Sequence, residues 1–484
     1  MLFFIKGKST EKILSQRMSK FINLQWEELL KDFTVNLVKL GKEEQPMNSP
    51  FMDNDGVDRV DPALKKAELL NREGEYSREY HTLATLASPV TPSQATFRNL
   101  KAKHPLRETE LLIPENIDVD AIQLSQDQVR AALRSAPRAS HPGPDGLRFE
   151  HLRQLSLSTP DILPTLTKII NNLITGKGAP QWYYLMMSSG CMIALQKPGS
   201  TDVRPIAMGT TLSKLISRAI QRSKQKAFDT VFRPTQYGVG LRRGTETIFH
   251  YTREALSRNP NWILIKIDFH NAFNEVHRQA ILDAVLFHFP ELYSWVKARY
   301  QQKSYLWARD SVKGKSRYIL SEEGVQQGDP LGPFLFALAL HHFLLQEINK
   351  SIKEVGEGIA LAYLDDIGLI GEPSAVTAGF QKIQEIGSAH GFKLNMVKSA
   401  IYCNGLDPTN LPPPLPQQLN RCTARMELLG GVIGSSEEVA TFLDRKIDAI
   451  IDESERVYRI DNTQQKLFLL RFCTCQKFNY LMRL

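Results

Sequence analysis

Two adjacent aspartates, Asp365 and Asp366, are the residues of this sequence most suited to chemistry. They stand between two short apolar runs, 358–362 and 367–370, whose length and composition predict β-strands. The pair is therefore predicted at the turn of a β-hairpin. Burying an ionised carboxylate is costly unless it is paired or binds a metal. A metal site is one interpretation of the pair, and an acidic hairpin tip that points into water is the other.

A third aspartate, Asp268, ends the continuous apolar run 262–267 and precedes a turn toward a helix that we expect to begin near Glu275. Strand alternation places Asp268 on the same face as Lys266, opposite the three isoleucines of the run. Ligands and metals gather at the carboxyl ends of buried strands in sheet-based sites. Asp268 is thus a second candidate ligand, with a plain cap of the next helix as the alternative.

Two cations are predicted on a short β-hairpin upstream of these aspartates. The strand that begins at Met192 runs into a turn, and a second strand covers 203–207, so that Lys197 and Arg204 would face each other. Arginine binds phosphate oxygens in a bidentate fashion, which suits the triphosphate of a nucleotide. Ordinary exposed surface charges are the alternative.

A glycine-rich turn, 324–333, precedes an apolar segment predicted as one long helix over 334–348. Gly328 would let the backbone approach a base or a sugar closely, and Gln326 or Gln327 could supply hydrogen bonds. The turn is not a phosphate-binding loop of the Walker type, because no Gly-Lys-Ser/Thr follows.

Positive charge is concentrated in one stretch of the chain. The net charge is +8, and the segment 213–243 holds eight Lys or Arg against a single Asp. Four of these residues recur every fourth position and would form one ridge on a helix: Lys214, Arg218, Arg222 and Lys226. Such a ridge is typical of contacts to a phosphate backbone, with a solvated helix face as the alternative.

Composition excludes several classes of protein. The chain has 484 residues, 42% hydrophobic and 23% charged, which predicts two to four soluble domains. No window is apolar enough to span a bilayer, so we expect an intracellular protein. The five cysteines have no paired CxxC spacing, which argues against a structural zinc site or a disulfide framework. Helical periodicity covers 11–33 and 63–86, and the polar segment 41–61 is typical of a linker.

The order of these motifs resembles that of reverse transcriptases, and most closely the enzymes of non-LTR (LINE-type) retrotransposons. The resemblance covers about 120–435 and rests on seven successive motifs: GPDGL at 143–147, RPI at 204–206, QYG at 236–238, Asp268 with Ala272-Phe273, GVQQGDP at 324–330, YLDD at 363–366, and GFKLN at 391–395 with Lys398.

The resemblance implies an α+β right-hand polymerase fold with an antiparallel palm sheet. It implies these domains: a helical N-terminal extension and linker at 1–115, fingers at 116–255, a palm at 256–410 with a fingers-like insertion at about 277–322, and an incomplete thumb at 411–484. The chain would then be a fragment or a decayed copy of a longer element protein. Nuclear action is the expectation that the family carries.

The resemblance also assigns roles within the site. Asp268 and Asp365 would hold two Mg²⁺ ions, or Mn²⁺, with Asp366 completing the acidic cluster, a donor set that fits the few carboxylates magnesium accepts. Lys398 would donate a proton to pyrophosphate. The remaining nucleotide contacts would come from Lys197 and Arg204 at the triphosphate, Phe273 at the sugar, and Gln327 and Gly328 beside the nascent base pair.

The implied partners are an RNA template, a DNA primer and deoxynucleotides, because Phe273 would exclude a 2′-hydroxyl. The basic ridge from Lys214 would follow the template or primer backbone. Asn274 stands where many relatives carry Asp, and no endonuclease motifs or trailing Cys/His cluster are seen. Two alternatives remain open: an RNA-directed RNA polymerase, which Phe273 disfavours, and a catalytically weak or inactive RNA-binding relic.

Overall fold

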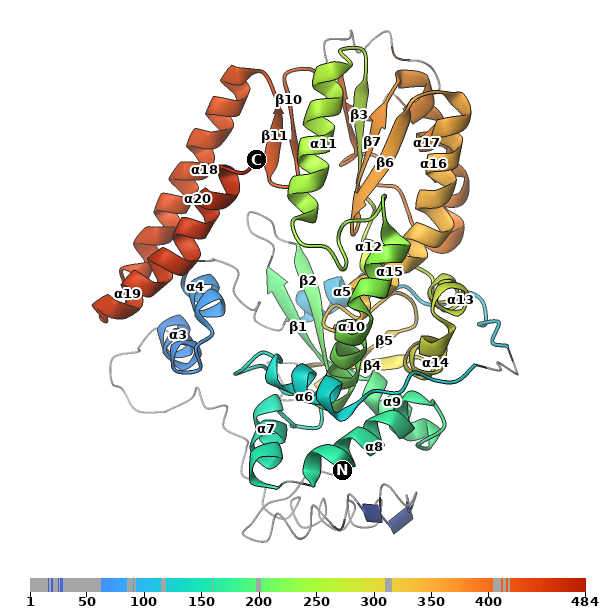
Figure 1. Ribbon diagram of the computed structural model, residues 1–484, viewed down its shortest axis with the longest axis vertical. Helices are drawn as coiled ribbons and strands as arrows, with labels where there is room; N and C mark the ends of the chain where they lie inside the picture. The colour runs from blue at the N-terminus through green and yellow to red at the C-terminus, as the bar shows by residue number, and fades with distance from the viewer. Residues whose placement is uncertain are drawn as a thin grey trace.

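The structure, a computed structural model, describes a large part of the chain. It covers residues 62–84, 90, 93–114, 119–159, 161–196, 202–309, 316–403, 411, 415–416 and 418–484, with residues 16, 19, 20, 25, 27 and 28 in addition. Lys197, the linker expected at 41–61 and most of the helix expected at 11–33 lie outside these residues. The described part is an α+β fold with two larger sheets and one β-hairpin (Figure 1).

A five-stranded sheet has the order β6-β7-β3-β8-β9 and lies toward the upper end of the molecule in Figure 1. All neighbouring strands are antiparallel except β8 and β9. The bounds are β3 Ile263–Ile267, β6 Gly358–Tyr363, β7 Asp366–Gly371, β8 Ala400–Cys403 and β9 Asn420–Cys422. The hairpin predicted around Asp365 is therefore present as β6 and β7.

Each face of this sheet is covered by helices (Figure 1). The isoleucines of β3 at 263, 265 and 267 are fully buried in the main core together with residues of two helices, α16 (Gln346–Val355) and α17 (Pro373–Ile386). Leu264, on the opposite face, packs with α11 (Gly244–Arg258). The alternation of side chains predicted for 263–267 is thus confirmed. Both faces of the strand are buried, and this burial fixes its register.

A four-stranded sheet with the order β2-β1-β4-β5 lies beside the first. Its strands are β1 Gly190–Gln196, β2 Val203–Gly209, β4 Ser304–Arg309 and β5 Ser316–Ser321. One face buries Met192, Val203, Leu306 and Ile319 against Leu100 of α5 (Gln94–Ala102). The segments 190–209 and 304–321, far apart in sequence, therefore build one structural unit.

The other helices surround these sheets or continue the chain beyond them (Figure 1). They are α3 Pro62–Arg72, α4 Tyr76–Ala84, α6 Gln126–Arg134, α7 Phe149–Ser158, α8 Ile162–Ile174, α9 Gln181–Ser188, α10 Thr211–Phe232, α12 Ala272–Glu275, α13 Arg278–His288, α14 Tyr293–Tyr300 and α15 Gly332–Leu340, with short 3₁₀ turns at Pro290–Leu292 and Ser388–His390. In the part of the chain that the structure describes, no helix is long and apolar enough to cross a membrane.

The C-terminal segment forms a hairpin and a helical arm. The hairpin is β10 Arg425–Leu428 with β11 Gly431–Gly434, and the arm is α18 Ser436–Val457, α19 Thr463–Leu469, a π-helix at Leu470–Thr474 and α20 Cys475–Leu481. Val457 and Leu469 of this arm share a small core with Tyr80 of α4. The arm and the α3-α4 pair therefore pack together, although they lie at opposite ends of the chain (Figure 1).

Three predicted helix boundaries were wrong. The helix expected at 334–348 is interrupted, because a π-helix, His341–Leu345, separates α15 from α16. The helix expected at 63–86 is two helices, which part around Gly74 with its φ of 72°, a value that glycine adopts without penalty. The helix expected near Glu275 begins at Ala272 instead.

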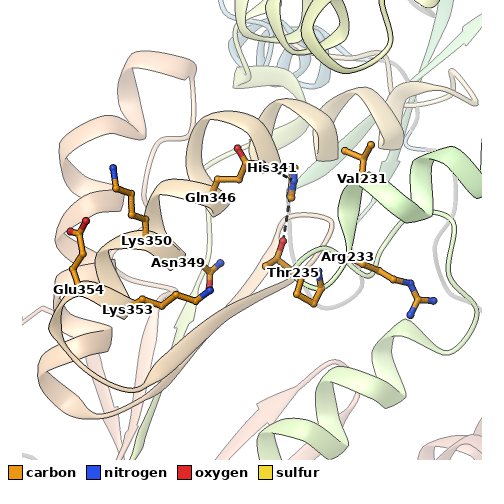
Figure 2. A pocket seen from close by; sticks show the side chains of 10 residues that line it. Val231, Arg233, Thr235, His341, Gln346, Asn349, Lys350, Lys353 and Glu354 are labelled. Atoms are coloured by element: carbon orange, nitrogen blue, oxygen red, sulfur yellow. Dashed lines mark hydrogen bonds between the residues drawn. The ribbon is translucent and has the colours of Figure 1, made fainter.

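The π-helix places His341 in the wall of a cavity of about 550 Å³ between the end of α10 and α16 (Figure 2). The Thr235 hydroxyl donates to Phe232 O and lies 3.3 Å from His341 Nδ1, while Gln346 Nε2 lies 3.2 Å from His341 Nε2. These partners suit a neutral ring that donates from Nδ1 and accepts at Nε2. Burial, and then the neighbouring His288 and His342, lower the pKa of His341 to about 4.

This histidine makes stability depend on pH. Between pH 6.5 and about 4, His341 is protonated in the unfolded chain but remains neutral in the folded protein. The free energy of unfolding should therefore fall by about 3 kcal/mol as the pH is lowered through this range. We expect His341→Gln, which does not titrate, to remove this part of the slope in urea unfolding at pH 7, 6 and 5. Parallel slopes for the wild type and the variant would contradict the assignment.

Candidate active site

The aspartate pair lies at a two-residue hairpin turn. Tyr363 pairs with Asp366 as the last rung of the ladder between β6 and β7, so Leu364 and Asp365 form the turn itself. Leu364 has a φ of 56°, a left-handed conformation that is unfavourable for a leucine and typical of tight hairpins. The turn that carries Asp365 therefore has a backbone conformation that a leucine at position 364 does not favour.

Asp268 lies at the same end of the sheet as the pair. Strand β3 is antiparallel to β7 with Ile267 opposite Ile367, and one further step of this register brings Asp268 opposite Asp366. The Asp268 backbone is held on both sides: its N–H donates to Ser399 Oγ at 3.1 Å, and its carbonyl accepts from the Asn395 N–H at 2.8 Å. The carboxylates of Asp268, Asp365 and Asp366, from two distant parts of the chain, thus lie at the same end of the sheet.

Burial and neighbouring charges shift the pKa values of the two aspartates in the turn. Burial raises the pKa of Asp365 to about 6, with further increases from the charges of Asp366 and Asp268 and an opposing effect of Arg204. Desolvation and the charge of Asp268 also raise the pKa of Asp366, and Lys266 opposes this. Burial is the largest cause of both shifts, and for Asp366 the charge of Lys266 outweighs that of Asp268. A bound cation would compensate for the burial of these carboxylates.

A metal at this edge would need ligands from outside the protein. Among the described residues, no three His, Cys, Asp or Glu side chains converge closely enough to hold an ion on their own. Magnesium, however, keeps several waters and combines one or two carboxylates with the phosphates of a substrate. The donor set of Asp268, Asp365 and Asp366 therefore fits Mg²⁺ bound together with a nucleotide.

Arg204 is a cation whose charge acts on Asp365. It lies on β2 with its exposed side chain on the open face of the four-stranded sheet, and its charge lowers the pKa of Asp365. Its direct partner across the hairpin is Leu195. Lys197 lies outside the described residues, so its predicted pairing with Arg204 stays a prediction.

Phe273 borders the site as a half-buried ring at the start of α12. It stacks on Phe336 of α15 with ring centroids 4.5 Å apart, and its carbonyl accepts from the Val325 N–H at 2.7 Å. The ring thus packs on Phe336, and the backbone of Phe273 is joined to the glycine-rich turn.

The glycine-rich turn approaches the protein's own strand. The Gln327 carbonyl accepts from the Ala207 N–H at 3.0 Å, and a Cβ on Gly328, whose φ is 139°, would lie 2.2 Å from Ala207 O. The close approach predicted for Gly328 therefore exists, but it is made to the backbone of β2. Gln326 is buried and binds Ser188 and Arg299, whereas the half-buried Gln327 remains a candidate for substrate contact.

Lys398 is exposed on the turn that holds Asp268. Its neighbour Ser399 makes the bond to Asp268, and its own N–H bonds Asn395 Oδ1 at 3.4 Å. The side chain is therefore free to reach a ligand beside Asp268.

The basic ridge on α10 divides into two halves. Lys214 Nζ donates to His141 O at 3.3 Å, and Arg218 donates to Ser135 Oγ at 3.2 Å, so both cations anchor neighbouring loops. Arg222 and Lys226 are exposed. Arg222 also lines a hollow with Arg130 and Arg134 of α6. Contact with nucleic acid stays a prediction for all four ridge residues, and the exposed half is the better placed.

Two features of the site were not predicted. Gln236 is fully buried and binds the backbone of Leu364 in the turn that carries Asp365. In addition, Trp307 and Tyr318 expose 40% and 51% of their surface on the same sheet face as Arg204. Gln236 belongs to the QYG motif at 236–238, but no local pattern indicates its bond to Leu364. The spacing of Tyr305 and Trp307, two residues apart in a strand, was a usable signal for the second feature.

Comparison with known proteins agrees with this arrangement. A family model described as reverse transcriptase (RNA-dependent DNA polymerase) matches residues 195–468. The chain is 24% identical over 339 residues to the transposon TX1 uncharacterized 149 kDa protein of Xenopus laevis, an alignment that covers 65% of this chain and 24% of that protein.

Two further relatives are proteins of retrotransposable elements. The chain is 24% identical over 282 residues to the retrovirus-related Pol polyprotein from type-1 retrotransposable element R2 of Nasonia vitripennis, covering 54% of this chain and 26% of the relative. It is 24% identical over 303 residues to the retrotransposable element SLACS 132 kDa protein of Trypanosoma brucei gambiense, covering 60% and 23%. The chain spans about a quarter of the length of these relatives.

Proposed function

The chain belongs to the reverse transcriptase (RNA-dependent DNA polymerase) family, and from this we propose that it extends the 3′-hydroxyl of a primer with deoxynucleotides on an RNA template. The observation that carries the proposal is the meeting of Asp268, Asp365 and Asp366 at one edge of the central sheet, with Arg204 beside them. A retrotransposon origin is part of the proposal, because the relatives named above are proteins of such elements.

The proposed right-hand assignment follows the two sheets. The five-stranded sheet would be the palm, the four-stranded sheet with its surrounding helices the fingers, and the arm from α18 to α20 the thumb. In this assignment the segment 304–321 of the proposed insertion adds two strands to the fingers sheet.

Asp268 and Asp365 would hold two Mg²⁺ ions, with Asp366 completing the site. Bound ions of this kind activate the attacking hydroxyl and stabilise the leaving oxygen of a phosphoryl transfer. Arg204 would bind the triphosphate and orient it for in-line attack. Lys398, on the turn that holds Asp268, would donate a proton to the pyrophosphate as it leaves.

Primer extension tests the proposal directly. The purified chain, supplied with Mg²⁺, an RNA template and an annealed DNA primer, should extend the primer with dNTPs. Extension with rNTPs alone would favour an RNA-directed RNA polymerase. Binding of the primer and template by a folded chain that extends neither substrate would favour a catalytically inactive relic.

Phe273 should set the choice of sugar. Because Phe336 supports its ring from behind, Phe273→Val is expected to open space at the 2′ position and to raise the use of rNTPs relative to dNTPs by roughly tenfold or more, as a polar-group clash of about 1–3 kcal/mol is removed. Competition between a dNTP and its rNTP in single-nucleotide extension measures this ratio. An unchanged ratio in an active variant would show that the discrimination comes from elsewhere.

The open face of the four-stranded sheet is proposed to receive the unpaired template. One face of this sheet is covered by α5, whereas Trp307 and Tyr318 are exposed on the other, their ring centroids 5.5 Å apart, on the side of Arg204. Exposed aromatic rings beside a cation are typical of surfaces that stack single-stranded bases.

Trp307→Ala should therefore weaken binding of a single-stranded RNA overhang by about fivefold to a hundredfold, since stacking contributes about 1–3 kcal/mol per base. Fluorescence anisotropy with a labelled primer and template measures the affinity. Tyr251→Ala, which removes another exposed aromatic ring, from α11, is the matched control. Equal losses in the two variants would argue against a specific stacking surface.

A further inference from the structure

The catalytic turn is held by a side chain from a distant segment. We propose that Gln236 is a positioning residue for this turn: its carboxamide holds Leu364 in the left-handed conformation that presents Asp365. The consequence for catalysis rests on the proposed function, whereas the consequence for the turn itself does not.

Both polar atoms of the Gln236 carboxamide bind the backbone of the turn or of Gly238. The side chain is fully buried. Its Oε1 accepts from the Leu364 N–H at 2.8 Å and from the Gly238 N–H at 2.9 Å, and its Nε2 donates to the Leu364 carbonyl at 3.2 Å. Both backbone polar groups of the turn residue are thus bound by one side chain.

The turn needs such support because of its own residue. Leu364 has a φ of 56°, a region in which the Cβ of a leucine clashes with its own backbone and which asparagine and glycine occupy far more readily. A hairpin turn with Asn or Gly at this position would hold itself. Here the strained conformation persists because surrounding contacts determine it.

The backbone around Gln236 docks on the same hairpin. Gln236 forms an isolated parallel bridge with Ala362, whose N–H donates to Thr235 O at 2.7 Å and whose carbonyl accepts from the Tyr237 N–H at 2.8 Å. Gly238 completes the fit, because a Cβ there would lie 2.5 Å from Leu364 N. The segment 235–238 is therefore held against the hairpin by backbone hydrogen bonds and packs directly on the turn.

The other end of this segment is fixed independently of the turn. Thr235 lies within hydrogen-bond distance of His341 in the wall of the cavity described above, as Figure 2 shows. The segment thus contacts the π-helix through Thr235 and binds the backbone of Leu364 through Gln236. Gln236 has no contact with the proposed reacting atoms, so its effect on catalysis would act through the placement of Asp365.

Gln236→Met tests the proposal, because methionine fills a similar volume and cannot make these hydrogen bonds. Amide hydrogen exchange is the first measurement. In the variant we expect the Leu364 N–H to exchange at least about tenfold faster than in the wild type, while the Ala362 N–H, bound to the backbone of Thr235, keeps its protection. Unchanged exchange at Leu364 would overturn the proposal, and this result does not depend on any activity.

Asn349→Leu is the matched control for stability. Asn349 is a second buried carboxamide that binds the same strand, through the N–H and carbonyl of Ala360, away from the turn. Its replacement should lower stability without speeding exchange at Leu364. Faster exchange at Leu364 in both variants would show a general loosening of the hairpin and would overturn a specific role of Gln236.

Primer extension then tests the catalytic consequence. Gln236→Met should lower kcat about tenfold or more and change the KM for dNTP by less than about twofold, since Arg204 and the glycine-rich turn are untouched. In a Leu364→Asn background, where the turn residue favours the left-handed conformation, the loss caused by Gln236→Met should shrink. An equal loss in both backgrounds would assign Gln236 a merely structural role.

Failure of the proposed function is a separate outcome. If the wild-type chain extends no primer, the polymerase proposal falls, while the exchange of Leu364 still decides whether Gln236 holds the turn.

Discussion

Asp365→Asn is expected to lower the rate of primer extension about a thousandfold, equivalent to about 4 kcal/mol of lost transition-state stabilisation. Asparagine keeps the size of the side chain and removes the charge that would hold Mg²⁺. The same change should leave the fold as stable as before or more so, because burial and the charges of Asp366 and Asp268 disfavour the ionised form of Asp365 in the folded state.

Primer extension and thermal unfolding of the same preparation measure both effects. Asp448→Asn, which removes an exposed carboxylate from α18, is the control for a loss of charge and should change neither rate nor midpoint appreciably. An active Asp365→Asn enzyme would refute the metal site. A strongly lowered midpoint would mean that Asp365 stabilises the fold, contrary to the repulsion described above.

The central hairpin and the strand before Asp268 could be predicted from sequence because their signals are local. Apolar runs of strand length flank Asp365-Asp366, and the alternation predicted for β3 is confirmed by its isoleucines on one face and Leu264 on the other. The α+β class and the meeting of the aspartates followed from the resemblance to reverse transcriptases. No local pattern could have joined Asp268 to Asp366, because that contact depends on the register of β3 against β7.

The features that were missed depend on tertiary context. A glutamine in a loop has no local signal for a bond to Leu364, which is 128 residues away. The periodicity of α10 correctly predicted a helix with basic residues in a row. It could not show that Lys214 and Arg218 anchor the loops at His141 and Ser135.

The π-helix inside the helix predicted at 334–348 was missed for a related reason. Hydrophobic periodicity locates a helix, whereas the π-helix at His341–Leu345 is continuous with its neighbours in sequence pattern and differs only in its hydrogen bonding.

Arg278→Met is expected to lower the free energy of unfolding by about 3–5 kcal/mol, because it leaves four buried hydrogen-bond acceptors without their donor, at about 1 kcal/mol or more each. Arg278 is fully buried, and burial lowers the pKa of its guanidinium to about 10, so the group stays charged at neutral pH. The guanidinium donates to the carbonyls of Gly324, Tyr300 and Gln302 and to Ser321 Oγ. Methionine would leave all four acceptors without this donor.

The substitution should also loosen the glycine-rich turn, because Arg278 binds both Gly324 in this turn and Ser321 at the end of β5. Arg278→Lys keeps the charge but cannot reproduce the planar fork, so it should recover only part of the stability. Arg258→Met, at an exposed ion pair with Glu254 on α11, should cost less than about 1 kcal/mol. Urea unfolding of the three variants orders these effects, and a cost for Arg278→Met as small as that for Arg258→Met would show that water satisfies the four acceptors in its place.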